Sequence, residues 1–184
     1  MAQKRKQKKQ ANTSASSWWQ EKKPVLRFAG GFIVAIFLMF WVTSGSFFDS
    51  IKEPLLHVYA SISATFLGWL GYSISAVGPV MSSADFSVSI EEGCDAIAPA
   101  ILFTAAILVF PGDWRKKLQG IILGLLAIFI LNIIRVVTLF LTGVHAESYF
   151  DLMHVEVWQT LFIISTLGMW LFWLKWANPL EKHA

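Results

Sequence analysis

The chain has 184 residues and a formal net charge of +3, and 55% of its residues are hydrophobic while only 15% are charged. Soluble domains carry about a quarter charged residues, and a soluble chain of this length would need more polar surface. The apolar residues also come in long blocks. The composition therefore excludes an ordinary soluble domain and indicates an all-α integral membrane protein.

The first 24 residues are polar and strongly basic. A basic head can bind nucleic acid, but the apolar run directly after it favours a positively charged flank of a membrane helix. We therefore expect residues 1–24 to form a disordered cytoplasmic tail with no nucleic-acid partner. The apolar run 28–48 is long enough to span a bilayer, and no small-x-small cleavage site ends it as in a signal peptide.

Two segments of different character come next. Residues 54–72 carry a weakly polar stripe at spacings of three and four, which predicts an amphipathic helix that spans the membrane or lies at its interface. Residues 73–93 alternate polar and apolar residues in SISAV and DFSVSI, separated by Gly78-Pro79 and a small polar patch. This pattern predicts short strands with turns, outside the hydrocarbon because open strands do not lie in lipid.

Three further apolar runs follow, at 96–110, 118–144 and 158–177, and the cluster Arg115-Lys116-Lys117 separates the first two. Positive clusters favour the cytoplasmic side, so the N-terminus and this cluster should share that side. Trp158 lies at one end of the last run, and Trp170, Trp173 and Trp176 cluster towards the other, as aromatic residues do at membrane interfaces.

This alternation predicts about four transmembrane helices, with helix 54–72 interfacial or re-entrant and a short strand segment on the outer face. Both termini would be cytoplasmic. The expected organisation is a polytopic membrane domain over 25–178 and a short cytoplasmic tail at 179–184. Cys94 and His154 would then both lie on the outer face.

Arg135 lies inside the run 118–144, where a charge costs several kcal/mol unless it is paired or solvated. It is nine residues from Val144, which is about 13 Å along a helix and within partial reach of a long side chain. Asn132 shares its helix face. These residues alone are equally compatible with two roles for Arg135. It could be functional, or it could be structural and paired with a carboxylate or a lipid phosphate.

Cys94 is the only cysteine, which excludes an internal disulfide and a cysteine-rich zinc site. Glu91, Glu92 and Asp95 would raise the pKa of its thiol unless a cation offsets them. Arg135 or a protonated His154 could supply that cation. Together these residues would provide a nucleophile, an oxyanion stabiliser and a general acid for peptide cleavage through a thioester acyl-enzyme.

Two other interpretations remain open. The chain could be a non-catalytic membrane subunit or transporter component in which Arg135 binds an anion or a partner helix, or an intramembrane protease that only hydrolyses. The sequence contains no phosphate-binding glycine loop, and the spacing of His145 and His154 is weak as a zinc pattern. We therefore expect no cofactor and no metal.

The ordered motifs Gly93-Cys94, Leu131-Asn132-Ile133-Ile134-Arg135 and Phe150-Asp151-Leu152-Met153-His154 resemble those of the exosortase/archaeosortase family. The resemblance covers about residues 50–175 and is greatest to the compact exosortase H type. One departure is Cys94-Asp95-Ala96, where many members have Cys-Ser-Gly.

The resemblance implies a multi-pass transpeptidase of the bacterial inner membrane with its active site on the periplasmic face. Its catalytic residues would be Cys94, Arg135 and His154. We expect Asn132 and Asp95, their neighbours in the chain or on the helix face, to support them. The implied partners are membrane lipids and client proteins that end in a short motif, a transmembrane helix and a basic cluster.

Overall fold

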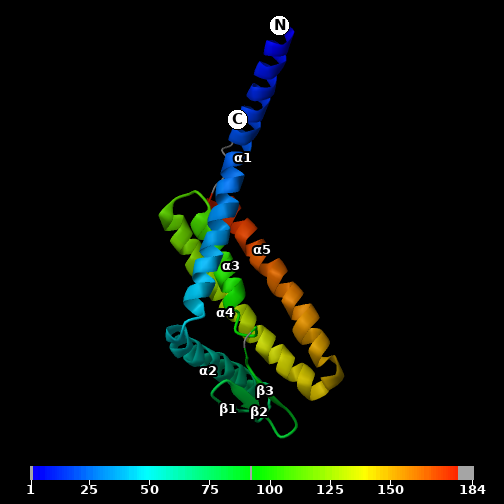
Figure 1. The fold of residues 1–184 in the computed structure, drawn as a ribbon. Helices are drawn as coiled ribbons and strands as arrows, with labels where there is room; N and C mark the ends of the chain where they lie inside the picture. The colour runs from blue at the N-terminus through cyan, green and yellow to red at the C-terminus, as the bar shows by residue number, and fades with distance from the viewer. Residues whose placement is uncertain (1, 92, 178–184) are drawn as a thin grey trace.

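The computed structural model describes residues 2–91 and 93–177, which form a mainly helical molecule with one small sheet (Figure 1). The predicted tail at 179–184 lies outside these residues. In chain order the elements are α1 (Ala2–Thr43), α2 (Ser46–Trp69), β1 (Ser75–Val77), β2 (Val80–Ser82), β3 (Ser87–Ser89), α3 (Ile97–Val109), α4 (Trp114–His145), a 3-10 turn (Glu147–Tyr149), a π-helical segment (Leu152–Val157) and α5 (Trp158–Ala177).

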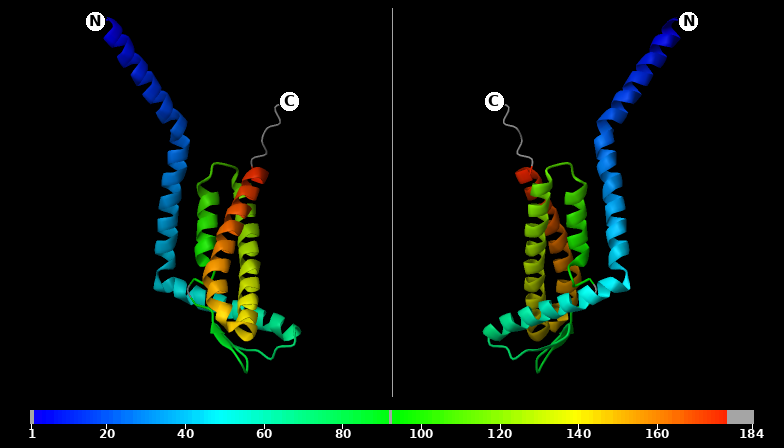
Figure 2. Two further views of the ribbon diagram at one scale, coloured as in Figure 1. Left: turned by 90° about the vertical axis from the view of Figure 1, so that its right-hand side faces the viewer. Right: turned by 90° about the vertical axis from the view of Figure 1, so that its left-hand side faces the viewer.

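The helices α1, α3, α4 and α5 run between two ends of the molecule, whereas α2 lies across one end (Figures 1 and 2). The start of α1, the α3–α4 loop and the end of α5 lie toward one end. The sheet, α2 and the α4–α5 connection lie at the other. This is the alternating layout expected from the basic clusters.

Within residues 2–91 and 93–177, three helical stretches are long and apolar enough to cross a membrane: Lys22–Thr43, Trp114–His145 and Glu147–Ala177. The remaining apolar helix, α3, has only 13 residues. At ~1.5 Å per residue it covers ~20 Å, which is less than the ~30 Å hydrocarbon core. Four transmembrane helices are therefore not confirmed. The helix α3 is short because the loop that carries Cys94 occupies the residues before Ile97, and Pro111 follows shortly after the helix ends at Val109.

The first apolar run ends earlier than predicted, since α1 stops at Thr43 instead of continuing to residue 48. The hydroxyls of Thr43 and Ser44 donate hydrogen bonds to the carbonyl of Phe40, at 3.1 and 2.7 Å. Gly45 then separates the two helices, and α2 begins at Ser46 rather than near residue 54.

At its other end, α1 begins at Ala2, so the basic segment that we expected to be disordered is helical in this structure. Alanine, lysine and glutamine are good helix formers, which accounts for a helix in so polar a segment.

The helix α2 is amphipathic as predicted. Its buried residues recur at helical spacing and face α4 and the sheet: Leu56, Tyr59, Ala60, Ser63 and Leu67. The polar stripe lies on the opposite side, where His57 and Thr65 are exposed. This crosswise helix therefore closes one end of the bundle with its apolar face inward.

The strands form an antiparallel sheet in the order β1-β2-β3. Ser75 pairs with Ser82 in the first hairpin, whose turn contains Gly78 with a φ of +60°. Val80 pairs with Ser89 in the second. Strand β2 lies between the two alternating segments, at residues for which the sequence pattern did not predict a strand. Its central residue Met81 is fully buried between the sheet and the helices, an environment that only the fold supplies.

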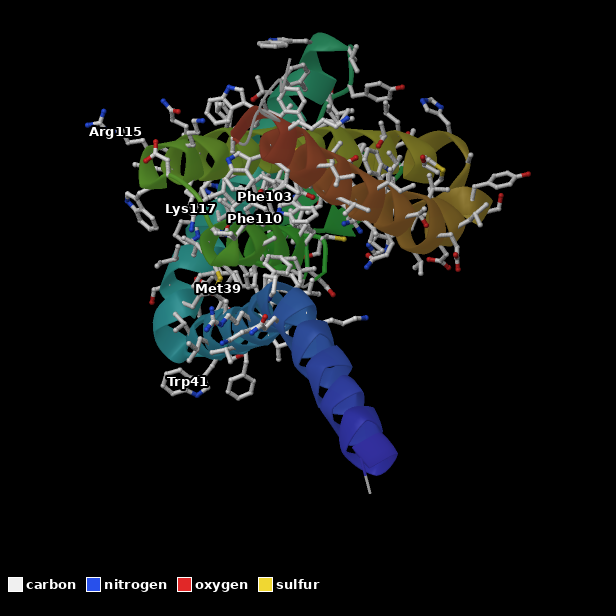
Figure 3. All side chains as sticks on the ribbon, turned by 90° about the horizontal axis from the view of Figure 1, so that it is seen from above. Met39, Trp41, Phe103, Phe110, Arg115 and Lys117 are labelled. Atoms are coloured by element: carbon white, nitrogen blue, oxygen red, sulfur yellow. The ribbon has the colours of Figure 1, made fainter. Side chains whose placement is uncertain are left out.

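A second core joins α3, α4 and α5. Its buried residues are Ala96, Phe103, Ile107, Ile128, Leu139, Trp158, Phe162 and Trp173. Viewed from above, Phe103 and Phe110 lie among the helices, whereas Trp41 points away from the bundle (Figure 3). At one end of this core, the ammonium groups of Lys116 and Lys117 donate to the carbonyls of Ala177 and Leu108, at 2.8 and 2.7 Å.

Candidate active site

The cysteine lies in a tight loop between β3 and α3. Gly93 has a φ of +87°, a left-handed conformation that glycine adopts without steric cost. The Cys94 amide donates to the carbonyl of Glu91 at 3.0 Å, and Oδ1 of Asp95 accepts from the amide of Ile97 at 3.0 Å. This last bond satisfies one of the free N–H groups at the start of α3, so the loop and the helix fix each other.

Two side chains of α4 hold this loop by its carbonyls. Asn132 Nδ2 donates to the Cys94 carbonyl at 2.9 Å, and Arg135 Nη1 donates to the Gly93 carbonyl at 3.1 Å. Both α4 residues are buried. Because they are three residues apart on one helix face, they present parallel donors to consecutive carbonyls.

His154 completes the group from the π-helical segment before α5. Its Nε2 lies 2.6 Å from the Sγ of Cys94, and its own carbonyl lies 3.5 Å from Nη2 of Arg135. The guanidinium therefore joins the cysteine loop to the histidine segment. The structure brings together all five residues that the sequence singled out: Cys94, Asp95, Asn132, Arg135 and His154.

The contacts of Arg135 differ from the carboxylate pairing that we considered for it. Among the described residues, its hydrogen-bond partners are backbone carbonyls, not a carboxylate. Its guanidinium carbon lies 5.4 Å from the centre of the Phe162 ring, and Nε has no hydrogen-bond partner among the described residues. The buried guanidinium of Arg135 thus has one N–H group, at Nε, without a hydrogen-bond partner among the described residues, and it lies close to the thiol loop.

The pKa of the Cys94 thiol is raised, chiefly because burial disfavours the thiolate. The positive charge of Arg135 opposes this effect, and the carboxylates of Asp95 and Glu91 add to it. Glu92, the third acid expected here, lies outside the described residues. A thiol in this setting needs a nearby base to become nucleophilic, and the His154 imidazole is in contact with it.

One residue beside the site was not predicted from the sequence. Tyr59 of α2 is buried, and its side chain interacts with that of Asn132. Burial raises the pKa of Tyr59 to about 12, with a smaller upward contribution from Asp95, while Asn132 lowers it. The available signal was its place opposite the polar stripe of α2, which predicts burial but not this neighbour. His145 does not join the site, since its Nε2 pairs with the hydroxyl of Tyr72.

Comparison with known proteins identifies the family of the chain. The family model described as transmembrane exosortase (Exosortase_EpsH) matches residues 15–174, which include every residue of the site. No curated protein and no solved structure matches the chain. Because the family model covers most of its length, the chain belongs to the transmembrane exosortase family.

Proposed function

We propose that this protein is a membrane cysteine transpeptidase that cleaves C-terminal sorting signals of secreted proteins, as the compact exosortase H type is expected to do. The observation that carries the proposal is the contact between the Cys94 thiol and the His154 imidazole at the end of a membrane-type bundle. Exosortase family membership supports a role in protein sorting.

The chemistry would proceed through an acyl-enzyme. Nε2 of His154 takes the proton of the Cys94 thiol, and the sulfur attacks the carbonyl carbon of the scissile peptide bond. The tetrahedral intermediate collapses when the C–N bond breaks, and the leaving amine takes the proton from His154. The resulting thioester is attacked by water or an acceptor amine, whose proton passes to His154 before the thiol is restored.

Arg135 and Asn132 would prepare the loop for this reaction. Their donors fix the carbonyls of Gly93 and Cys94, so the sulfur keeps one position relative to the imidazole. The charge of Arg135 also favours the thiolate. Its Nε–H is buried and has no partner among the described residues, so the developing oxyanion would be stabilised by the charge of the guanidinium.

The proposed setting is the bacterial inner membrane, with the site on the periplasmic face and both termini in the cytoplasm. The clients would be proteins with a C-terminal motif, a transmembrane helix and a basic cluster. A basic cluster keeps the client's last residues in the cytoplasm. The scissile motif would then meet the periplasmic end of the bundle.

Co-expression with a tagged client precursor tests the proposal, by comparison of the wild type with Cys94→Ala and Cys94→Ser. Both variants should leave the precursor uncleaved at wild-type enzyme levels. Equal processing by Cys94→Ala would reject the cysteine mechanism and leave the non-catalytic subunit as the better interpretation. The mass of the client's new C-terminus separates transfer to an acceptor from simple hydrolysis.

A further inference from the structure

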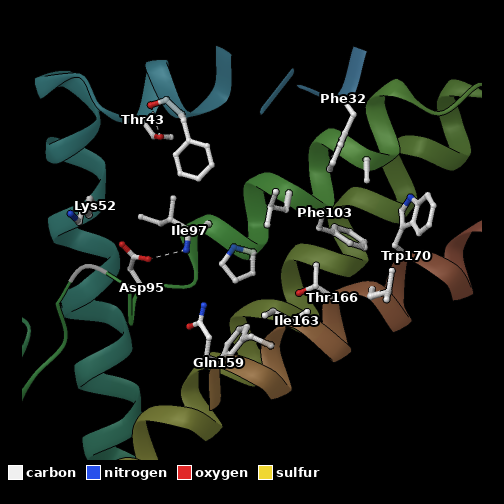
Figure 4. Close-up of a pocket in the computed structure, with 18 of the residues that line it drawn as sticks. Phe32, Thr43, Lys52, Asp95, Ile97, Phe103, Gln159, Ile163, Thr166 and Trp170 are labelled. Carbon is white, nitrogen blue, oxygen red and sulfur yellow. Dashed lines mark hydrogen bonds between the residues drawn. The ribbon is translucent and has the colours of Figure 1, made fainter. Parts of the chain in front are cut away.

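A large groove runs along the bundle beside the thiol loop. It has a volume of about 940 Å³, its walls are α1 and α5, and α3 forms its floor. Figure 4 shows Phe32 and Thr43 on the α1 side, Ile97 and Phe103 on α3, and Gln159, Ile163, Thr166 and Trp170 on α5.

Aromatic rings close the groove at the end away from the thiol. Phe28 of α1 lies 6.2 Å from Trp170 of α5 and 6.0 Å from Phe110, measured between ring centres. Nearer the thiol, wall residues such as Ile163 and Leu167 are more than half exposed. Apolar side chains exposed on membrane-type helices face either lipid or another helix.

The other end of the groove reaches the candidate active site. Gly93, Asp95 and Arg135 line it there, so the groove is continuous with the backbone on both sides of Cys94. Arg135 is only 4% exposed, and its Nε is the donor without a partner among the described residues. This mainly apolar groove is also lined by Asp49 and Lys52 of α2, and its end at the thiol loop adjoins the residues that carry the chemistry.

We infer that this groove seats the membrane-embedded helix of the substrate polypeptide, with the scissile bond just beyond that helix. The inference rests on the proposed function and adds the place of docking. Part of the floor presents the alanines Ala98 and Ala106, which allow a helix to approach closely beside the larger Leu102 and Phe103. A helix along this floor ends at the thiol loop and delivers the extended chain beyond it to Cys94. A lipid acyl chain could fill the same groove, but it would not bring a peptide bond to Cys94.

Two neighbouring isoleucines of α5 give a matched test. Ile163 lines the groove and is 61% exposed, whereas Ile164 does not line it and is 63% exposed. A photoreactive benzoylphenylalanine is placed at each position in the Cys94→Ala protein, which is co-expressed with a tagged client precursor. We expect the adduct with the client at position 163 to exceed that at 164 by about tenfold or more. Equal or absent client adducts, or adducts with lipid alone, would overturn the inference.

Blocking the groove supplies a second readout in the active protein. Ile163→Trp should slow client processing by about tenfold or more, whereas Ile164→Trp should process the client like the wild type at equal protein levels. If Ile163→Trp processes normally while Cys94→Ala does not, the docking site is wrong and the cysteine mechanism stands. If Cys94→Ala also processes normally, the proposed function itself fails.

Discussion

Asp95 affects the thiol loop in two opposed ways. Its carboxylate accepts a hydrogen bond from the Ile97 amide and so stabilises the start of α3. The same charge raises the pKa of Cys94 and disfavours the nucleophilic form. Ala96 next to it has a φ of +59°, a left-handed conformation that costs ~1 kcal/mol or more for a residue with a Cβ. A glycine at this position would avoid that cost.

The two effects of Asp95 separate in Asp95→Asn, because asparagine keeps the acceptor oxygen and loses the charge. Removing a negative neighbour favours the thiolate, so the pKa of Cys94 should fall. The rate of alkylation by iodoacetamide, measured against pH, should then rise at lower pH than in the wild type. Asp85→Asn, an exposed acid with no influence on this pKa, is the control. A profile that stays in place or moves to higher pH would contradict this account.

At the scale of elements, α4 uses glycines to receive aromatic rings from three neighbours. A Cβ at Gly120 would overlap Trp173 of α5, and one at Gly124 would overlap Phe103 of α3. A Cβ at Gly143 would overlap Phe86, which precedes β3. Each contact lets a ring lie directly on the α4 backbone. The helix that carries Asn132 and Arg135 is thereby held against α3, α5 and the strand segment at once.

Gly124→Ala should therefore destabilise the protein, because the Phe103 ring is buried and must shift to make room. Overpacking of this kind costs about 1–3 kcal/mol, which should lower the melting temperature of the protein in detergent by several degrees. Gly168→Ala on α5 has open space around the new Cβ, and its melting temperature should be unchanged or slightly raised. Equal melting temperatures for the two variants would show that Phe103 moves without cost.

At the scale of the whole molecule, the candidate site and the basic cluster lie at opposite ends of the bundle. Lys116 and Lys117 bond to the last carbonyls of α5 and α3, where positive charge also favours the helix dipoles. The lysines that indicate sidedness in the sequence thus also hold three helix ends together.

This arrangement predicts opposite accessibility for the two connecting loops. In the Cys94→Ala protein, Ser148→Cys at the α4–α5 connection should react with a membrane-impermeant maleimide added outside spheroplasts. Gly112→Cys in the α3–α4 loop should react only after the membrane is opened. Both positions are exposed in the structure, so burial does not explain a difference. The reverse labelling pattern would invert the proposed orientation.

The sequence by itself determined the membrane class, the amphipathic α2 and the presence of strands before Cys94, and it singled out five residues that the structure brings together. These follow from local properties, namely hydropathy, periodicity and residue chemistry. Predictions failed where local signals competed: Phe47 and Phe48 continue the apolar run in the sequence, yet hydroxyl bonds and Gly45 end α1 before them.

Only the tertiary structure decided what those residues touch. Cys94 and His154 are 60 residues apart, and Asn132 and the Cys94 carbonyl are 38 apart. Packing of α4 against α3 and α5 brings them into contact, and packing of α2 adds Tyr59. The partners of Arg135 and the groove beside the thiol likewise depend on how helices cross. No single segment encodes them, because a contact between distant residues is a property of packing and not of local pattern.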